Sequence, residues 1–295
     1  MKSILIYNPK SGKGKILKYL DYIKSELSKF YDHLDVHESK SANDITEVVK
    51  ASSKVYDRII IAGGDGTFNN AAQGLSSCDN RPPLGFIPVG TCCDIAGNLG
   101  IPKKIKKAVE VIKKDHLVYH DVGMINDTYF MYVVAIGACT ATPYTTKQDA
   151  KRIIGRLAYV KDGLDEFFNT PLSNVCMKCN GMEVKERVPL LLVMNTYSVG
   201  GIKFNKNSTL NDGNFDVVLI HNGKGKGRFN ILGYFIAGLL GFKRKPNALT
   251  LSSSRVEIEI DNDSVWCVDG ERGPSGSVEI INLHNHLRII APNKE

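Results

Sequence analysis

The sequence lacks the features of a membrane-spanning chain and of a disulfide-stabilised secreted domain. No apolar run reaches the roughly 20 residues that a helix needs to cross a bilayer, and three glycines interrupt the best candidate, Phe229–Phe242. The seven cysteines are odd in number and scattered, which does not indicate a disulfide framework. The N-terminus enters an apolar strand directly and shows no signal-peptide pattern. We therefore expect a cytoplasmic protein.

Common motifs for zinc and for nucleotides are missing as well. The single CxxC, Cys176–Cys179, has no second pair to complete a zinc site. The first glycine-rich turn matches neither the Walker A motif nor GxGxxG. The net charge of +7 is moderate, with basic clusters at Lys103–Lys114 and Lys243–Lys245. Such clusters suit a membrane surface, nucleic acid or a phosphorylated ligand, and equally a solvated helix face.

The first 120 residues alternate strand and helix patterns. Predicted strands are Ser3–Asn8, Leu34–Glu38, Arg58–Ala62 and Leu84–Pro88, and predicted helices are Lys13–Phe30, Ala42–Ser52, Thr67–Gly74 and Lys103–Lys113. Apolar strands that alternate with helices predict an α/β domain, in which helices cover a parallel sheet. Ligands of such sheets bind at the carboxyl ends of the strands.

From about Asp121 the pattern changes to short β-branched runs separated by Gly, Asn and Asp. These runs are Tyr129–Ile136, Asn174–Cys179, Val188–Asn195, Phe215–His221, Leu249–Ile260 and Ser277–Ile281. They predict a mainly antiparallel domain, with helical insertions near Ala150–Phe168 and Phe229–Phe242. A chain of 295 residues is long for one domain. We expect an α/β domain at 1–121, to which 282–295 return through a strand at Leu287–Ala291, and a β-rich domain at 122–281.

Three glycine-rich turns follow predicted strands of the first domain. They read Asn8-Pro9-Lys10-Ser11-Gly12-Lys13-Gly14, then Gly63-Gly64-Asp65-Gly66-Thr67-Phe68-Asn69, then Gly90-Thr91-Cys92-Cys93-Asp94. Glycine allows a backbone to approach a ligand closely, and the start of a helix offers N–H groups to phosphate. Asp65 and Asp94 are of the residue type that holds Mg²⁺ and its water shell. The turns therefore predict a phosphate-binding centre at one cleft.

These turns, with two later motifs, resemble the diacylglycerol kinase catalytic family, which includes bacterial soluble lipid kinases and the sphingosine and ceramide kinases. Asn211–Asp216 resembles the family's DDG segment, and Asp269-Gly270-Glu271 resembles its DGE motif. The five motifs follow the family's order over nearly the whole chain. The resemblance implies an N-terminal α/β domain like that of NAD kinase and phosphofructokinase, followed by a mainly antiparallel β-sandwich.

The resemblance also implies a role for individual residues. Glu271 would be the general base toward the acceptor hydroxyl, and the catalytic set would also include Asp269, Asp65 and Asp94. Mg²⁺ near the phosphates would be organised by Asp65, Asp94 and Asp121, and a second, structural Mg²⁺ by Thr209, Asp212 and Asn214. The residues in contact with ATP would be Asn8, Pro9, Lys10, Ser11, Gly12, Lys13, Ser39, Gly63, Gly64, Asp65, Gly66, Thr67, Asn69 and Thr91.

The implied activity is transfer of the γ-phosphoryl group of ATP to the hydroxyl of diacylglycerol or a related lipid, as in phospholipid biosynthesis. Phosphoryl transfer needs neutralisation of phosphate charge and an in-line nucleophile, and a carboxylate assists deprotonation of an alcohol. We expect a lipid acceptor, peripheral contact with an anionic membrane surface and no nucleic-acid partner, and we leave a homodimer open.

Two alternatives stay open at this point. NAD kinases also contain a GGDG segment, although their NE-type motif is not found here, whereas DGE is present. A non-catalytic nucleotide- or lipid-binding regulator is the other alternative, because Cys93 replaces the family's asparagine and Asn211 replaces the first aspartate of DDG. Retention of Asp65, Asp94 and Glu271 favours an enzyme.

Overall fold

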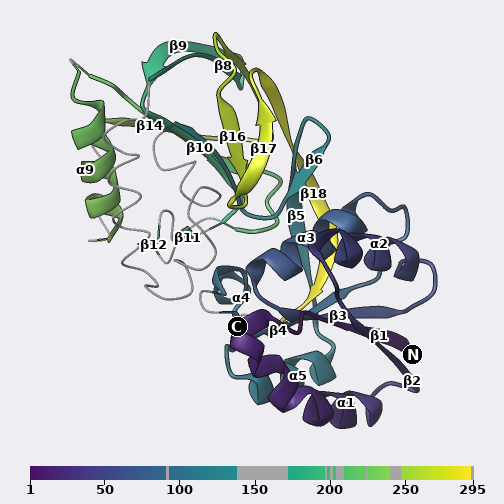
Figure 1. The fold of residues 1–295 in the computed structure, drawn as a ribbon. Helices are drawn as coiled ribbons and strands as arrows, with labels where there is room; N and C mark the ends of the chain where they lie inside the picture. Colours follow the sequence, from purple (N-terminus) through teal and green to yellow (C-terminus); the bar gives the residue numbers. More distant parts are fainter. Residues whose placement is uncertain are drawn as a thin grey trace. The chain divides into compact units, whose positions relative to one another are not determined.

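The computed structural model describes residues 1–90, 93–137, 172–196, 198–199, 202–203, 209–223, 225–239 and 247–293. The chain divides into two compact units (Figure 1). The first unit comprises Met1–Val122, Leu210–Asp212 and Leu283–Glu295, and the second comprises Gly123–Thr209 and Gly213–Asn282. The predicted helix near Ala150–Phe168 lies outside the described residues. No helix in the described ranges is long and apolar enough to cross a membrane.

A parallel sheet forms the centre of the first unit. Its strands are β1 (Lys2–Tyr7), β2 (His33–Glu38), β3 (Arg58–Gly63) and β4 (Leu84–Pro88), in the order β2-β1-β3-β4. The end of β18 (Val278–Ile290) adds a further parallel strand beside β4, with Ile289 opposite Leu84. Leu5, Ile6 and Ile60 are fully buried, as expected for a sheet covered on both faces.

Helices cover both faces of this sheet, with α1 and α5 on one and α2 and α3 on the other (Figure 1). Their bounds are η1 (Ser11–Tyr19), α1 (Leu20–Ser28), α2 (Ala42–Ser52), α3 (Asp65–Ser76), α4 (Asp94–Asn98) and α5 (Ile105–Lys114). The expected helical start at Lys13 is wrong, because Gly12, Lys13 and Gly14 all have left-handed backbone angles inside a 3₁₀ segment. Regular α-helix begins only at Leu20.

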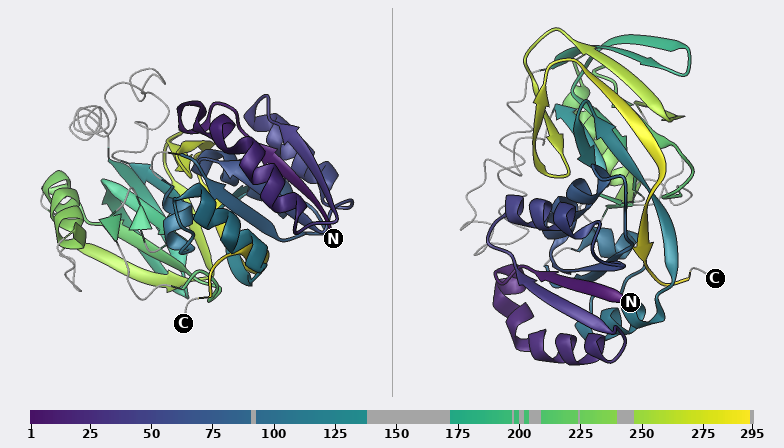
Figure 2. Two further views of the ribbon diagram at one scale, coloured as in Figure 1. Left: turned by 90° about the horizontal axis from the view of Figure 1, so that it is seen from below. Right: turned by 90° about the vertical axis from the view of Figure 1, so that its right-hand side faces the viewer.

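The second unit contains two antiparallel sheets that share one core (Figure 2). One sheet has the order β14-β13-β10-β7-β16-β17. Its strands are β7 (Val133–Gly137), β10 (Leu190–Met194), β13 (Phe215–Ile220), β14 (Ala248–Ser253), β16 (Val265–Val268) and β17 (Glu271–Ser275). The other comprises the first part of β18, then β15 (Arg255–Ile260), β8 (Ser173–Cys179) and β9 (Met182–Val188).

Alternate side chains from both sheets fill the core of the second unit. Val134, Leu191, Val175 and Ile258 pack in one buried cluster around Trp266, whose indole N–H donates to the carbonyl of Gly276 over 2.9 Å. The smaller elements are β5 (Leu117–Ile125), β6 (Thr128–Phe130), β11 (Ser198–Val199), β12 (Ile202–Lys203) and α9 (Gly227–Leu239). The predicted fold class, an α/β domain followed by a mainly antiparallel domain, is confirmed.

A bidentate ion pair joins the start of β3 to the end of α5 in the first unit. Arg58 donates from Nε and Nη2 to the two carboxylate oxygens of Asp115, over 2.8 and 2.6 Å. The two side chains are only 16% and 20% exposed. The Asp115 charge would therefore be poorly solvated without its partner.

We expect Arg58→Met to lower the free energy of unfolding by about 2 kcal/mol, because it leaves a largely buried carboxylate without its cation. The urea midpoint, followed by circular dichroism, measures this loss. Lys50→Met is the control, because Lys50 pairs with Glu47 at an exposed site and should change stability by less than about 0.5 kcal/mol. Equal effects of the two variants would contradict the interpretation.

Candidate active site

The first glycine-rich turn is bonded to the second through Asn8. The backbone N–H of Asn8 donates to the carbonyl of Ala62 over 3.0 Å, and its side-chain amide donates to the hydroxyl of Thr67 over 3.4 Å. The Asn8 side-chain oxygen in turn accepts the N–H of Lys10 at 3.0 Å. One asparagine thus fixes the shape of its own turn and its position beside the start of α3.

The first turn also lies against the third, at Gly12. A Cβ atom on Gly12 would stand 2.4 Å from the carbonyl oxygen of Val89, and Gly12 has a φ of +59°. Only glycine meets both conditions without strain. Gly12 is therefore required by this contact, whatever the turn binds.

The second and third turns approach each other backbone to backbone. A Cβ atom on Gly90 would lie 2.8 Å from the Cα atom of Gly64. The N–H of Val89 donates to the carbonyl of Gly63 over 2.7 Å, which holds the two turns at this separation. The structure therefore brings all three predicted turns together at the carboxyl ends of β1, β3 and β4, although Thr91 and Cys92 lie outside the described residues.

Asp65 is the first residue of α3, and its carboxylate binds the start of α4. One oxygen accepts the N–H of Asp94 at 3.0 Å and the other accepts the N–H of Ile95 at 3.2 Å. A carboxylate at this position satisfies two N–H groups that the short helix leaves unpaired. Asp65 thereby fixes the position of Asp94, the first residue of α4.

The charge of Asp65 is electrostatically unfavourable in this position. Burial raises the pKa of the Asp65 carboxyl, and the negative charge of Asp94 adds to the rise, while the two backbone hydrogen bonds oppose it. Two neighbouring carboxylates offer the oxygen donors that Mg²⁺ prefers, and a cation would offset their repulsion. The donor set therefore fits Mg²⁺. No group of three or more His, Cys, Asp or Glu side chains in the described ranges is arranged to hold a metal, so water and phosphate would complete the coordination.

Cys93 precedes α4 in a left-handed conformation, with a φ of +51°. Its buried thiol donates to the carbonyl of Gly90 over 3.1 Å. Asparagine adopts this conformation more readily than cysteine, which gives a backbone reason for asparagine at this position. Here the thiol bonds to the carbonyl of Gly90, the residue of the third turn that packs against Gly64.

Three further predicted nucleotide or metal residues occupy buried positions in the first unit. Ser39 follows β2 and donates its N–H to the carbonyl of Tyr7 over 2.9 Å. Asn69, inside α3, has a buried Oδ1 without a hydrogen-bond partner in the part of the chain that the structure describes. Asp121 in β5 is fully buried, and its carboxylate accepts the N–H of Asn285 at 2.7 Å. Sequence reasoning missed Asn285, whose left-handed backbone, with a φ of +53°, has no sequence signal beyond the residue type.

In the second unit, the DGE motif forms a two-residue hairpin loop. Val268 pairs with Glu271 across the strands β16 and β17, and the loop residues Asp269 and Gly270 both have positive φ, +49° and +87°. Two positive φ angles and an Asp-Gly sequence are typical of a type I′ turn, whose twist matches that of the strands. The turn places the exposed Glu271 at the first position of β17.

The Asp269 carboxylate binds three consecutive backbone N–H groups before and within β7. It accepts from Met131 at 2.6 Å, from Tyr132 at 3.0 Å and from Val133 at 2.9 Å. The backbone N–H of Asp269 also donates to the carbonyl of Val133 over 2.8 Å. Asp269 therefore holds the hairpin loop against β7. The sequence did not predict this structural role.

The three residues of the predicted structural Mg²⁺ site are divided between the two units. Asp212 belongs to the first unit and is exposed, whereas Thr209 and Asn214 are assigned to the second. The N–H of Asp121 donates to the carbonyl of Leu210 over 2.8 Å, and His284 contacts the carbonyl of Asn211 at 3.0 Å. Leu210 and Asn211, at the start of the segment that resembles DDG, are thus held beside Asp121 and His284 in the first unit, whereas Gly213–Asp216 belong to the second.

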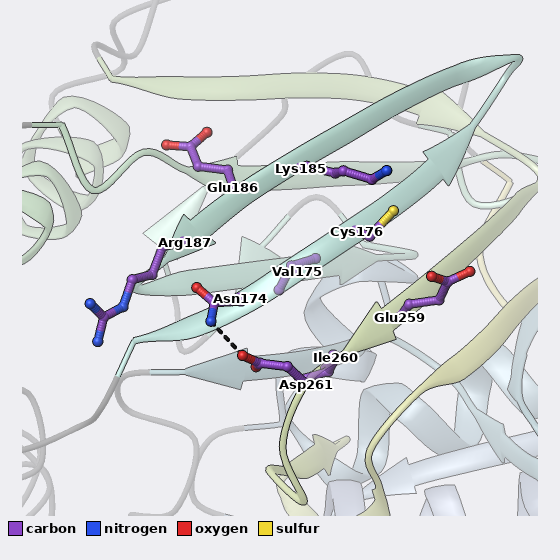
Figure 3. A pocket seen from close by; sticks show the side chains of 9 residues that line it. All are labelled: Asn174, Val175, Cys176, Lys185, Glu186, Arg187, Glu259, Ile260 and Asp261. Atoms are coloured by element: carbon purple, nitrogen blue, oxygen red, sulfur yellow. Dashed lines mark hydrogen bonds between the residues drawn. The ribbon is translucent and has the colours of Figure 1, made fainter.

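A shallow hollow of about 590 Å³ lies on β8, β9 and β15 of the second unit (Figure 3). Lys185 and Arg187 are on its wall together with Glu186, Glu259 and Asp261, and Asp261 accepts a hydrogen bond from Asn174. Its mixed charges favour no one class of ligand, and none of the predicted site residues lines it. The predicted site residues lie elsewhere, in the group of turns of the first unit and, separately, in the DGE hairpin of the second.

Residues 2–125 match the model of the diacylglycerol kinase catalytic domain. A diacylglycerol kinase of Bacillus subtilis (strain 168) is 30% identical over 298 residues, covering 99% of this chain and 96% of that protein. The chain belongs to the diacylglycerol kinase family. A family member from Staphylococcus carnosus (strain TM300) is 29% identical over 98% of this chain and 94% of its own. A crystal structure of a diacylglycerol kinase from Bacillus anthracis str. Sterne has a TM-score of 0.82 at 26% identity, covering 99% of this chain and 97% of that one.

We expect Asp65→Asn to raise the melting temperature of this diacylglycerol kinase family member at pH 7. The raised pKa means that the folded protein binds the Asp65 proton more tightly than the unfolded chain, so the ionised carboxylate disfavours folding at neutral pH. The neutral amide removes that cost and keeps one oxygen that accepts one of the two N–H groups of α4. The gain should diminish as the pH falls toward the ordinary value of 3.8, because wild-type Asp65 then becomes protonated. A gain that does not depend on pH would contradict this cause.

Asp269→Ala should lower the free energy of unfolding by about 1–3 kcal/mol, because three backbone N–H groups lose their acceptor. Asp263→Ala is the matched control, since Asp263 is an exposed loop aspartate of the same unit and should change stability by about 0.5 kcal/mol or less. Urea denaturation of both variants measures the difference, and a loss no greater than that of the control would show that the three bonds contribute little.

Proposed function

We propose that this protein transfers the γ-phosphoryl group of ATP to the hydroxyl of diacylglycerol or a related lipid. The main support is the convergence of three glycine-rich turns, with Asp65 bonded to the start of α4, at one end of a parallel sheet. That is where α/β proteins bind their ligands. Relatives named diacylglycerol kinase match nearly the whole chain, which favours a lipid as the acceptor.

The first unit would bind the nucleotide. Glycines in the turns would let phosphate lie next to backbone N–H groups rather than next to side chains. Lys13 is exposed and stands between two glycines with left-handed angles, which suits a cation directed toward phosphate oxygens. The other proposed contacts are Asn8, Pro9, Lys10, Ser11, Gly12, Ser39, Gly63, Gly64, Asp65, Gly66, Thr67, Asn69 and Thr91.

Asp65, Asp94 and Asp121 would organise Mg²⁺ mainly through its bound waters, since no three such side chains in the described ranges are grouped to hold a metal directly. When bound, Mg²⁺ neutralises charge that develops on the phosphate oxygens. The unfavourable ionisation of Asp65 beside Asp94 supports this assignment, because a cation would compensate it. A second, structural Mg²⁺ would be held at Thr209, Asp212 and Asn214, where Asn211 in place of aspartate leaves fewer carboxylates.

Glu271 would accept the proton of the lipid hydroxyl. A primary alcohol is a weak nucleophile at neutral pH, and a carboxylate within hydrogen-bond reach increases its reactivity. Glu271 is exposed next to the hairpin loop, whereas both oxygens of Asp269 accept backbone hydrogen bonds. We therefore assign proton transfer to Glu271 and the positioning of Glu271 to Asp269.

The second unit would bind the acceptor. The protein would work in the cytoplasm, in peripheral contact with an anionic membrane.

The direct test is a transfer assay with Mg-ATP and diacylglycerol in mixed micelles, in which we expect phosphatidate. NAD in place of the lipid should accept no phosphate. Efficient transfer to NAD without transfer to diacylglycerol or related lipids would overturn the proposal in favour of an NAD kinase. ATP binding without transfer to any acceptor would indicate a regulator.

Glu271→Gln should lower kcat by at least about a hundredfold, because an amide cannot accept the proton, while the Kd for ATP stays within about twofold. Single-turnover phosphatidate formation and equilibrium nucleotide binding give the two quantities. Arg272→Gln, the exposed neighbour on β17, serves as the matched control and should retain turnover. A parallel loss of turnover and nucleotide binding in Glu271→Gln would mean that Glu271 has another role.

A further inference from the structure

The inner face of helix α9 packs against the six-stranded sheet of the second unit. Ile231 and Tyr234 are buried in one cluster with Leu192 of β10 and Val218 of β13. Asn230 donates its side-chain N–H to the carbonyl of His221 over 2.7 Å and accepts from Asn247 at 2.9 Å. The helix is therefore anchored on the outer side of the six-stranded sheet (Figure 2).

The outer face of α9 is apolar and exposed. Phe229 is 74% exposed, more than any other large hydrophobic side chain in the part of the chain that the structure describes, and Ile236 is 49% exposed. The two residues are seven positions apart, which places them on one side of a helix two turns apart. Gly233 lies between them, so no charged side chain separates them. A helix that is apolar on both faces requires a partner for the outer one.

The charge of the surrounding sequence indicates the nature of that partner. No aspartate or glutamate occurs between Asp216 and Glu257. In the sequence, Lys224 and Lys226 precede the helix, Arg228 is its second residue, and Lys243-Arg244-Lys245 come after it. Apolar side chains on a helix with cations at its ends are typical of segments that lie in the headgroup region of an anionic bilayer.

We propose that the outer face of α9, with Phe229 and Ile236 in the bilayer interface, docks this protein on anionic membranes. The inference rests on the proposed function in one respect, since a kinase that acts on diacylglycerol has to reach it in a bilayer. At 13 residues, α9 is too short to cross a membrane, so it lies along the surface. A second copy of the chain is a poorer occupant, because two equally cationic segments would face each other.

Sedimentation with vesicles tests the docking surface without any kinase assay. Wild-type protein should bind phosphatidylcholine vesicles that contain about 30 mol% phosphatidylglycerol, and bind pure phosphatidylcholine at least about tenfold more weakly. The Phe229→Ser, Ile236→Ser double variant should lose about tenfold or more in affinity for the anionic vesicles. The matched control is Val55→Ser with Met182→Ser, at side chains that are 57% and 46% exposed and lie outside α9. It should bind as wild type does.

A transfer assay separates failure of this inference from failure of the proposed function. The double variant should phosphorylate short-chain diacylglycerol in detergent at the wild-type rate, and long-chain diacylglycerol in vesicles at least about tenfold more slowly. Wild-type affinity of the double variant, or equal binding of neutral and anionic vesicles, would overturn the docking surface. If the wild-type protein is a dimer and the double variant is a monomer, the outer face of α9 would instead be the contact with a second copy of the chain. The predicted vesicle binding without lipid phosphorylation would support the surface and refute the proposed function.

Discussion

The backbone contact between Gly64 and Gly90 is the constraint on which the first unit's site depends. Both residues follow parallel strands, and a side chain on Gly90 would push the two turns apart. Their separation determines whether the Asp65 carboxylate reaches the N–H groups of Asp94 and Ile95. The same arrangement holds Val89 against Gly12. Gly90 and Gly12 are therefore steric requirements of the fold, which composition alone does not reveal.

Several residues at this site are held in unfavourable states. Lys13 and Cys93 have positive φ, and burial next to the Asp94 carboxylate disfavours the charged form of Asp65 and raises its pKa. Such states cost free energy and persist only where the surrounding structure fixes them. Here the parallel sheet and the hydrogen bonds of Asn8 provide that support. Concentration of strain at the proposed phosphate site agrees with a site arranged for a charged ligand rather than for stability.

Much of the fold could be predicted from the sequence because its signals are local. The apolar run Ile59-Ile60-Ile61 and the following glycines identified β3 and its turn, and β-branched alternation identified the antiparallel domain. The first helix was misplaced, because helical periodicity cannot reveal three left-handed residues in succession. The bonds from Asp269 to residues 131–133 join positions 136 to 138 apart in the chain, and no local pattern reports such a contact.

The Asp269–Gly270 loop also explains why the DGE motif is defined by its length. Side chains on a strand alternate between the two faces of a sheet. One residue inserted into this loop would either lengthen the loop or shift β17 by one position against β16, and such a shift would turn Glu271 to the opposite face of the sheet. In this protein a shift of that kind would reverse the direction in which the carboxylate points, a larger change than many substitutions on the same strand would cause.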